Sequence, residues 1–379
     1  MKRFFILSAV AAALGFCAVA LAAEPIRIGA VLSVTGPASF LGEPEKNSML
    51  MLQDEINAKG GVLGRMIELV VYDDETDVNK AVLATEKLLK KDGVAVALGS
   101  SITGNTLAMS GKFVSAETPL VSLAAAEKIV RPVNPWVFKV AQSDRLAVGR
   151  ILAHAKSRGY KNIALITVSD GFGQAGREVL KEMLPAEGFT LAADEVYGPK
   201  DTDMTAQLTK IKSAGADAII CWGTNPGPAV VAGNRIHLGM ATPLYMSHGV
   251  ASKKFIELAG AAANGLLLPA SKLIVADQLP DNDPQKVLLT GYAKDYQAKF
   301  GAAPSQFGGY GYDSLLLAVR AIEAAGSDKP AGIRAALEKL TDVSGVTGVF
   351  SMSPGDHNGL SESAFVMVEI VDGDWKIIP

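Results

Sequence analysis

Cysteine and histidine are scarce in this chain, which has two cysteines and four histidines among 379 residues. No cysteine pair has the spacing of a zinc site, no His-Glu-X-X-His segment occurs, and no acidic loop of the calcium-binding type is present. We therefore expect neither a structural metal nor a cofactor. Cys17 lies in an N-terminal apolar run, so Cys221 is the one cysteine of the remaining chain and cannot form a disulfide within it.

An excess of charge of one sign is also missing, since 36 basic and 39 acidic residues give a formal net charge of −3. Lysine and arginine are scattered along the chain, so no basic face that would bind nucleic acid is predicted. Low-complexity segments and linkers rich in proline, glycine or serine are absent too. With 49% apolar residues, the chain can form two compact domains, each with its own core.

Long apolar runs are confined to the N-terminus. Two basic residues precede the apolar run 4–21, and small residues follow it, which predicts a signal peptide cleaved after Ala22 or Ala23. A membrane anchor is the alternative, because the run is almost long enough to span a bilayer. The small residues at its exit favour cleavage, and Phe16 before Cys17 argues against a lipid-modified cysteine. We therefore predict an exported, periplasmic protein.

After the leader, short β-branched runs alternate with longer segments of helical period, which predicts parallel sheets covered by helices on both faces. The rhythm runs through one half of the chain and begins again after Val140, so the fold class is α/β with two doubly wound lobes. Asp372-Gly373 between two further strands predicts a hairpin. In chain order, we expect strands at 26–32, 67–72, 94–98, 120–122, 136–140, 163–168, 191–197, 218–222, 244–246, 265–269, 366–371 and 375–378, and helices at 43–58, 78–91, 105–116, 144–157, 174–187, 203–213, 228–237, 285–300, 310–325 and 331–340.

The segment 99–108 is a small, hydroxyl-rich turn between a buried strand and a helix. The first N–H groups of a helix lack internal partners and carry the positive end of its dipole, so such a turn can hold an anion. Ser101 and Thr103 would be additional donors in a carboxylate site. The alternative is that one of these hydroxyls only caps the helix.

Two further patterns suggest enzymes. Gly171-Phe-Gly-Gln-Ala-Gly176 has the spacing of a dinucleotide-binding turn, with Asp194 about 20 residues further on. Asp170 would place a carboxylate where a pyrophosphate should lie, and an exported protein meets little nucleotide. Cys221 with His248 could form a thiol–imidazole pair, although a cysteine inside a strand is typically a buried, inert thiol. We expect no enzyme.

Four segments together resemble the substrate-binding proteins of ABC transporters for branched-chain amino acids. They are 26–42, 54–61, Val71-Tyr-Asp-Asp74 and Asp170-Gly-Phe-Gly173. The resemblance implies a type I periplasmic binding fold, in which two lobes joined by three crossing segments close on a ligand. The crossings would fall near 142–143, 269–272 and 348–350. One lobe would then hold residues 24–142 and 272–348, and the other 143–271 and 349–379.

The resemblance also implies a ligand site. The carboxylate of an amino acid would be held by the hydroxyl of Thr103 and by the turn 123–126, and its ammonium by a threonine and a glutamate. Those two positions read Ala126 and His248 here, and a buried ammonium without an acidic partner is costly. His248 could instead donate to an acceptor or, if protonated, pair with a second anion. The expected ligand-binding residues are Phe40, Leu41, Ser101, Ile102, Thr103, Leu123, Ala124, Ala125, Ala126, Phe172, Asn225, His248 and Phe307.

We therefore predict a monomeric solute-binding protein that delivers a small molecule to an ABC permease in the inner membrane. The missing ammonium partners favour a small carboxylate, for example an aromatic acid, while an amide or amino-acid-like compound remains open. A ligand-sensing module for a membrane receptor is an alternative that the sequence does not separate from transport.

Overall fold

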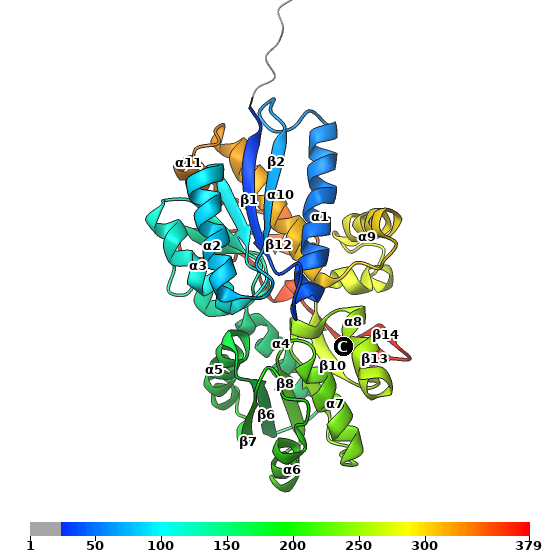
Figure 1. Cartoon of the computed structure of the whole chain (residues 1–379). Coiled ribbons are helices and arrows are strands. Elements are labelled where there is room, and N and C mark those ends of the chain that lie inside the picture. Colours follow the sequence, from blue (N-terminus) through cyan, green and yellow to red (C-terminus); the bar gives the residue numbers. More distant parts are fainter. Residues whose placement is uncertain (1–23) are drawn as a thin grey trace, which may run out of the picture.

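The computed structural model describes residues 24–379, and the predicted signal peptide lies outside these residues. The described chain forms two lobes, one above the other in Figure 1, each built on its own sheet. The five-stranded sheet of the first lobe is parallel and has the order β2-β1-β3-β4-β5. The seven-stranded sheet of the second lobe has the order β14-β13-β10-β9-β8-β6-β7, with β13 antiparallel to its neighbours. The predicted pair of α/β lobes is confirmed.

The first lobe takes its sheet from the N-terminal part of the chain and closes it with helices from a later part. The strands β1 and β3 are buried almost throughout, because helices cover both faces of a parallel sheet. Its elements are β1 (Ile26–Leu32), α1 (Ser39–Ala58), β2 (Ile67–Asp73), α2 (Val78–Lys87), β3 (Val96–Gly99), α3 (Thr103–Ser115), β4 (Leu120–Ser122), β5 (Val137–Lys139), α9 (Lys286–Phe300), α10 (Gln306–Ala325), α11 (Pro330–Leu337), β11 (Val343–Ser344) and β12 (Val349–Phe350).

The second lobe is built from the middle of the chain and receives its last strands from residues beyond 365. Its β8 is wholly buried between two helical layers. The elements are α4 (Asp144–Ser157), β6 (Asn162–Val168), α5 (Gly171–Ala186), β7 (Thr190–Tyr197), α6 (Thr205–Ser213), β8 (Ala218–Trp222), α7 (Gly227–His237), β9 (Leu244–Met246), the short turn η3 (His248–Val250), α8 (Lys253–Ala259), β10 (Leu267–Ala270), β13 (Val366–Val371) and β14 (Asp374–Ile378). The hairpin predicted at Asp372-Gly373 joins β13 and β14.

Helix α1 begins at Ser39, four residues earlier than the pattern predicts, and continues through Pro44. Pro44 is the sixth residue of α1, where its missing N–H removes one internal hydrogen bond without ending the helix. This earlier start puts Leu41 and Glu45 four residues apart on one helix, and therefore on one face. Both residues are buried, and both line the cavity between the lobes.

The chain leaves the sheet of the first lobe after β5 and the sheet of the second lobe after β10. The third passage lies later than predicted. Phe350 and Met352 belong to the core of the first lobe, and the backbone N–H of Lys139 donates to the carbonyl of His357. The β11–β12 hairpin holds this segment on the first lobe, so we place the third crossing between Leu360 and β13 instead of at 348–350.

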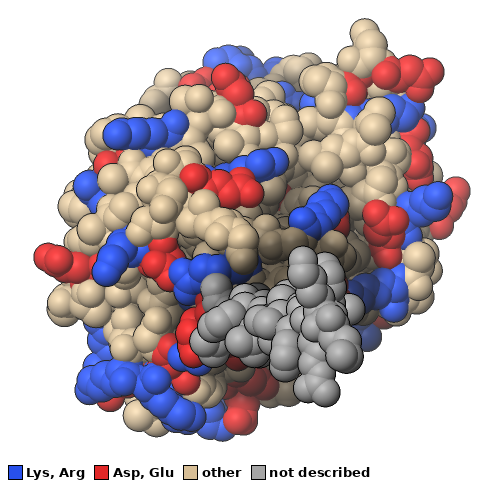
Figure 2. All heavy atoms as spheres, turned by 90° about the horizontal axis from the view of Figure 1, so that it is seen from above, with Lys and Arg blue, Asp and Glu red and all other residues tan. Residues whose placement is uncertain are grey.

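The surface that faces the viewer in Figure 2 carries basic and acidic side chains side by side, without a large field of one sign. In residues 24–379, no helix has both the length and the apolar character needed to cross a membrane.

The glycines of the 171–176 turn serve helix–sheet packing. A Cβ atom at Gly173 would lie 1.9 Å from the carbonyl oxygen of Val168, and one at Gly176 would lie 2.0 Å from Nε1 of Trp222. Asp194, the acidic residue of the dinucleotide pattern, forms a two-bond ion pair with Arg177 at 2.7 Å. These residues bring α5 close to β6 and β8, which explains their spacing without a nucleotide.

We predict that Gly176→Ala destabilises the protein by about 2–4 kcal/mol, because the new methyl group must displace the buried Trp222. Urea denaturation measures this change. Gly111→Ala is the matched control, since Gly111 is an exposed glycine within α3 that has open space around its Cβ position. The control should gain up to about 1 kcal/mol. Equal stability of the two variants would contradict the packing role.

Candidate functional site

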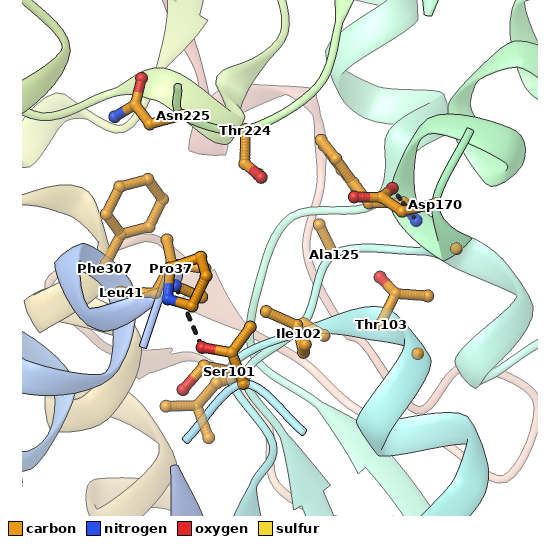
Figure 3. A pocket seen from close by; sticks show the side chains of 18 of the residues that line it. Pro37, Leu41, Ser101, Ile102, Thr103, Ala125, Asp170, Thr224, Asn225 and Phe307 are labelled. Atoms are coloured by element: carbon orange, nitrogen blue, oxygen red, sulfur yellow. Dashed lines mark hydrogen bonds between the residues drawn. The ribbon is translucent and has the colours of Figure 1, made fainter. Parts of the chain in front are cut away.

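A cavity of about 220 Å³ lies between the two lobes and is lined by both. In Figure 3, Ser101, Ile102 and Thr103 approach it from the first lobe, and Thr224 and Asn225 face them from the second. Its volume suits a small solute and is too small for a peptide or a dinucleotide. The structure places eleven of the thirteen predicted ligand residues on its wall, namely Leu41, Ser101, Ile102, Thr103, Leu123, Ala124, Ala125, Phe172, Asn225, His248 and Phe307.

The turn between β3 and α3 points the start of α3 at this cavity. Gly99 has a φ of +120° and packs so closely on β1 that a Cβ would lie 2.0 Å from the Val31 carbonyl oxygen, so only glycine fits. The N-cap of α3 is Ile102, whose side chain cannot bond to the first-turn N–H groups. The helix-cap interpretation of Ser101 and Thr103 therefore fails. Thr103 is the first residue of α3 and faces the cavity, where its hydroxyl adds to the N–H groups of the helix end.

Ser101 has a different role from the one predicted for it. Its hydroxyl oxygen accepts a hydrogen bond from the backbone N–H of Ser33 at 3.0 Å and is paired with Oε2 of Glu45. Glu45 is fully buried, and burial raises the pKa of its carboxyl well above the usual value. Sequence reasoning missed Glu45, although its spacing of four residues from Leu41 would have placed it in the site had the helix start been correct.

The second turn, Leu123–Ala126, presents small side chains and backbone to the cavity, and a buried lysine holds it from behind. The ammonium of Lys139 donates to the carbonyl of Ala125. Burial lowers the pKa of Lys139 to about 8, while the nearby Asp144 acts in the opposite direction, so the lysine keeps its charge at neutral pH. Its positive charge therefore lies one layer behind the wall of the cavity.

The second lobe contributes Asp170 and Phe172 at the start of α5. One oxygen of Asp170 accepts hydrogen bonds from the N–H groups of Phe172 and Gly173 at 2.9 and 2.8 Å. Burial raises the pKa of this carboxyl. Because the side chain caps the helix itself, those N–H groups are not available to a phosphate, which removes the dinucleotide interpretation of the turn. The starts of α3 and α5 meet here, since a Cβ at Gly171 would lie 3.4 Å from the nitrogen of Gly104.

His248 and Asn225 bring buried polar atoms to the cavity from the second lobe. Both ring nitrogens of His248 and both amide atoms of Asn225 lack a hydrogen-bond partner within the described chain. The imidazole packs edge-on against the rings of Phe172, Trp222 and Phe365. Burial, aided by the charge of Lys139, lowers the pKa of His248 to about 3. The histidine is therefore neutral, which favours hydrogen bonding over the alternative of an ion pair between a protonated His248 and a second anion.

The whole chain can be compared with known proteins at this point. The family model described as "Periplasmic binding protein" matches residues 25–374. This chain belongs to that family.

Relatives of this periplasmic binding protein span nearly its whole length. The leucine-, isoleucine-, valine-, threonine- and alanine-binding protein of Pseudomonas aeruginosa is 25% identical over 90% of this chain and 88% of its own. A Leu/Ile/Val-binding protein homolog of Brucella abortus is 24% identical over 92% and 91% of the two chains. An extracellular ligand-binding receptor from Rhodopseudomonas palustris HaA2 has a TM-score of 0.87 at 30% identity, over 94% of this chain and all of its own. The substrate-binding protein LivJ of Streptococcus pneumoniae, solved with isoleucine, shares the fold at a TM-score of 0.82 and 24% identity, over 94% and 99%. These relatives are named as ligand-binding or substrate-binding proteins and not as enzymes. Their names agree with the sequence-based expectation of a binding protein.

Two predicted ligand residues lie outside the cavity wall of this periplasmic binding protein. Ala126 is fully buried among Ile129, Val130 and Val137, because the turn bends inward after Ala125. Phe40 lies behind the wall and packs edge-on against Phe307 at a ring distance of 5.7 Å. The family resemblance pointed to Leu41 with Phe40 beside it, but adjacent residues on a helix point in different directions.

The thiol–imidazole alternative has no support in the geometry. Cys221 is buried inside β8, and burial raises the pKa of its thiol to about 12. The cysteine is not on the cavity wall, and in residues 24–379 no cluster of three or more acidic, histidine or cysteine side chains could hold a metal ion.

We predict that His248 makes the ligand-free protein less stable in acid. Its pKa of about 3 in the folded state lies below the value of about 6.5 in an unfolded chain. The unfolded state therefore binds the extra proton first, and stability is lost as the pH falls through this window. In His248→Phe, the drop in unfolding free energy from pH 7 to pH 4 should shrink by roughly 1–3 kcal/mol. Urea denaturation at both pH values measures it, and an equal drop in both proteins would refute the assignment.

Proposed function

We propose that this protein is the solute-binding component of an ABC importer and that it carries a small organic carboxylate, with aromatic acids as the preferred class. The observation that carries this proposal is the open start of α3, which faces a closed cavity between the lobes. A helix start with uncapped N–H groups is a ready site for a carboxylate. The neutral His248 stands where the family resemblance would place the acidic partner of an ammonium.

The body of the cavity supports an apolar or aromatic ligand. Its wall includes Leu41, Ile102, Phe172 and Phe307, which come from both lobes. Phe172 and Phe307 can each offer a ring face or edge to a flat ligand. A ligand that touches all four residues bridges the lobes, and such bridging contacts are what stabilise the closed state over the open one.

Charge at the site is compatible with a carboxylate, although no Lys or Arg from residues 24–379 lines the cavity. The positive contributions are the dipole of α3 and the ammonium of Lys139, which bonds to the Ala125 carbonyl behind the wall. The carboxyls that line the cavity, Glu45 and Asp170, both have raised pKa values from burial, which favours their neutral forms. Repulsion of a ligand anion is reduced accordingly.

An amino acid is the second candidate, favoured by the names of the relatives and by Asp170. The second oxygen of this carboxyl could face an ammonium near α3, even though its first oxygen caps α5. The burial of Asp170 and its raised pKa weigh against an ion pair there before ligand binds. The alternative of a sensory module keeps the same ligand site, and loss of ligand uptake in cells that lack the protein would distinguish transport from sensing.

Titration calorimetry on the purified protein, stripped of ligand by unfolding and refolding, tests the ligand class. We expect benzoate-type acids to bind with a Kd near 1 μM, which corresponds to about −8 kcal/mol. Leucine should bind at least 100-fold more weakly, because its ammonium would lose solvent without a charged partner. Tight binding of leucine, with no binding of the aromatic acids, would replace the first candidate by the second.

The hydroxyl of Thr103 should contribute directly to carboxylate binding. We predict that Thr103→Val weakens the binding of a benzoate-type acid by about 1–3 kcal/mol, or roughly 5- to 150-fold. Valine keeps the methyl group that would lie 3.6 Å from a Cβ at Gly171, so the contact between the lobes is preserved. Thr103→Ser, which keeps the hydroxyl, is the control and should bind nearly as well as the unmodified protein. Unchanged affinity in Thr103→Val would mean that the backbone N–H groups alone hold the ligand.

A further inference from the structure

Glu45 is a buried carboxyl on the cavity wall that the carboxylate site does not use. It lies on α1, where the backbone is held against α10, since a Cβ at Gly311 would lie 2.3 Å from the Glu45 carbonyl oxygen. The side chain is fully buried and still lines the cavity. A carboxyl in such a place needs hydrogen-bond partners for both of its oxygens.

The two oxygens of Glu45 are in different situations. Oε2 is paired with the hydroxyl of Ser101, which is itself fixed by the backbone N–H of Ser33. Oε1 is buried and has no hydrogen-bond partner among residues 24–379. The carboxyl is thus anchored through one oxygen and unpaired at the other.

The neighbouring polar groups cannot fill this gap. The hydroxyl of Tyr310, which also lines the cavity, donates to Gln142 and accepts from Gln306, both at 2.6 Å. Asp74, whose charge raises the pKa of Glu45, is an acceptor and already receives hydrogen bonds from Ser33 and Ser100. Since the adjacent side chains are committed, a donor for Oε1 has to come from the cavity.

Glu45 and the start of α3 mark different ends of the cavity. Glu45 belongs to α1 and its backbone packs against α10. Thr103, in contrast, contacts the start of α5 in the other lobe. Figure 3 draws Ser101, Leu41 and Phe307 on one side of the cavity and Thr103 with Asp170 on the other. A ligand whose carboxylate lies at Thr103 therefore extends its far end toward Glu45.

We propose that Oε1 of Glu45 forms a second polar subsite, which accepts a hydrogen bond from a hydroxyl or N–H group at the end of the ligand remote from its carboxylate. This inference rests on the proposed function and narrows its ligand class to acids that carry a distal donor, such as hydroxybenzoates. The short body between the two ends then packs against the apolar wall.

The protonation state of Glu45 suits this role. Burial raises the pKa of the carboxyl, with the negative charge of Asp74 acting in the same direction. The hydroxyl of Ser101 donates to Oε2, so Oε1 is the oxygen that the chain leaves for a hydrogen bond with the ligand. Because burial favours the neutral form of this carboxyl, its repulsion of the ligand carboxylate is reduced.

The test compares acids that differ only in the distal donor. Titration calorimetry on the stripped, full-length mature protein uses 3- and 4-hydroxybenzoate beside 3- and 4-methylbenzoate, whose methyl group matches the hydroxyl in size. At least one hydroxy acid should bind tenfold or more tightly than its methyl counterpart, because an unmatched methyl leaves Oε1 unpaired. If each hydroxybenzoate bound with the same affinity as its methyl counterpart, the inference would be overturned, and no protein variant would be needed to reach that conclusion.

Two variants locate the effect at Glu45. Glu45→Met keeps the length of the side chain without an acceptor, so the preference for the hydroxy acid should fall at least tenfold while the methyl acid still binds. Glu45→Gln keeps a carbonyl oxygen and should retain the preference. A preference that survives in Glu45→Met would overturn the inference and leave the proposed function standing. If no benzoate-type acid binds the unmodified protein, the proposed function fails and this inference fails with it.

Discussion

Closure of the two lobes buries polar atoms that the protein does not pair by itself, and this constraint governs the site. Within residues 24–379, Oε1 of Glu45, the amide of Asn225 and the ring nitrogens of His248 all lack partners. Each such group costs about 1–3 kcal/mol when it is removed from water without a hydrogen bond. A ligand that supplies these bonds offsets the cost, so the cavity selects for the polar pattern of its ligand as well as for its shape.

The proposed site would bind a carboxylate through the oriented backbone N–H groups of α3 and the more distant charge of Lys139. Lys139 donates to the Ala125 carbonyl and does not line the cavity. A lysine inside the cavity would attract any anion, whatever its shape. Its charge polarises the peptide that joins Ala125 to Ala126 and supports the neutral form of His248. Fixed dipoles of this kind need no rearrangement when the ligand arrives, and they discriminate by geometry, as the uncapped start of α3 does.

The α/β lobes could be predicted from the sequence, because strands and helices of a parallel sheet have distinct periods. Most of the cavity wall followed from the family resemblance of four segments, which placed the turns 99–108 and 123–126 at the ligand. Glu45 could not, since the predicted helix began at residue 43, after Leu41, and the two residues did not appear to share a helix face. The resemblance placed the third crossing near 348–350, and sequence periodicity could not refine it, because β11 and β12 are two residues each. The partners of Ser101 were equally hidden, because Ser33 and Glu45 are 68 and 56 residues away in sequence.

The interleaved path of the chain also sets the order in which the molecule can fold. The first lobe needs Phe350 and Met352 to complete its core, and the second lobe needs β13 on the far side of the same segment. The core of the first lobe is therefore incomplete until residues more than 300 positions apart have met, and that of the second until residues more than 200 positions apart have met. Contacts so remote in sequence form slowly. A chain with this connectivity stays incompletely folded while it is being made, a state in which a polypeptide can still be threaded across a membrane.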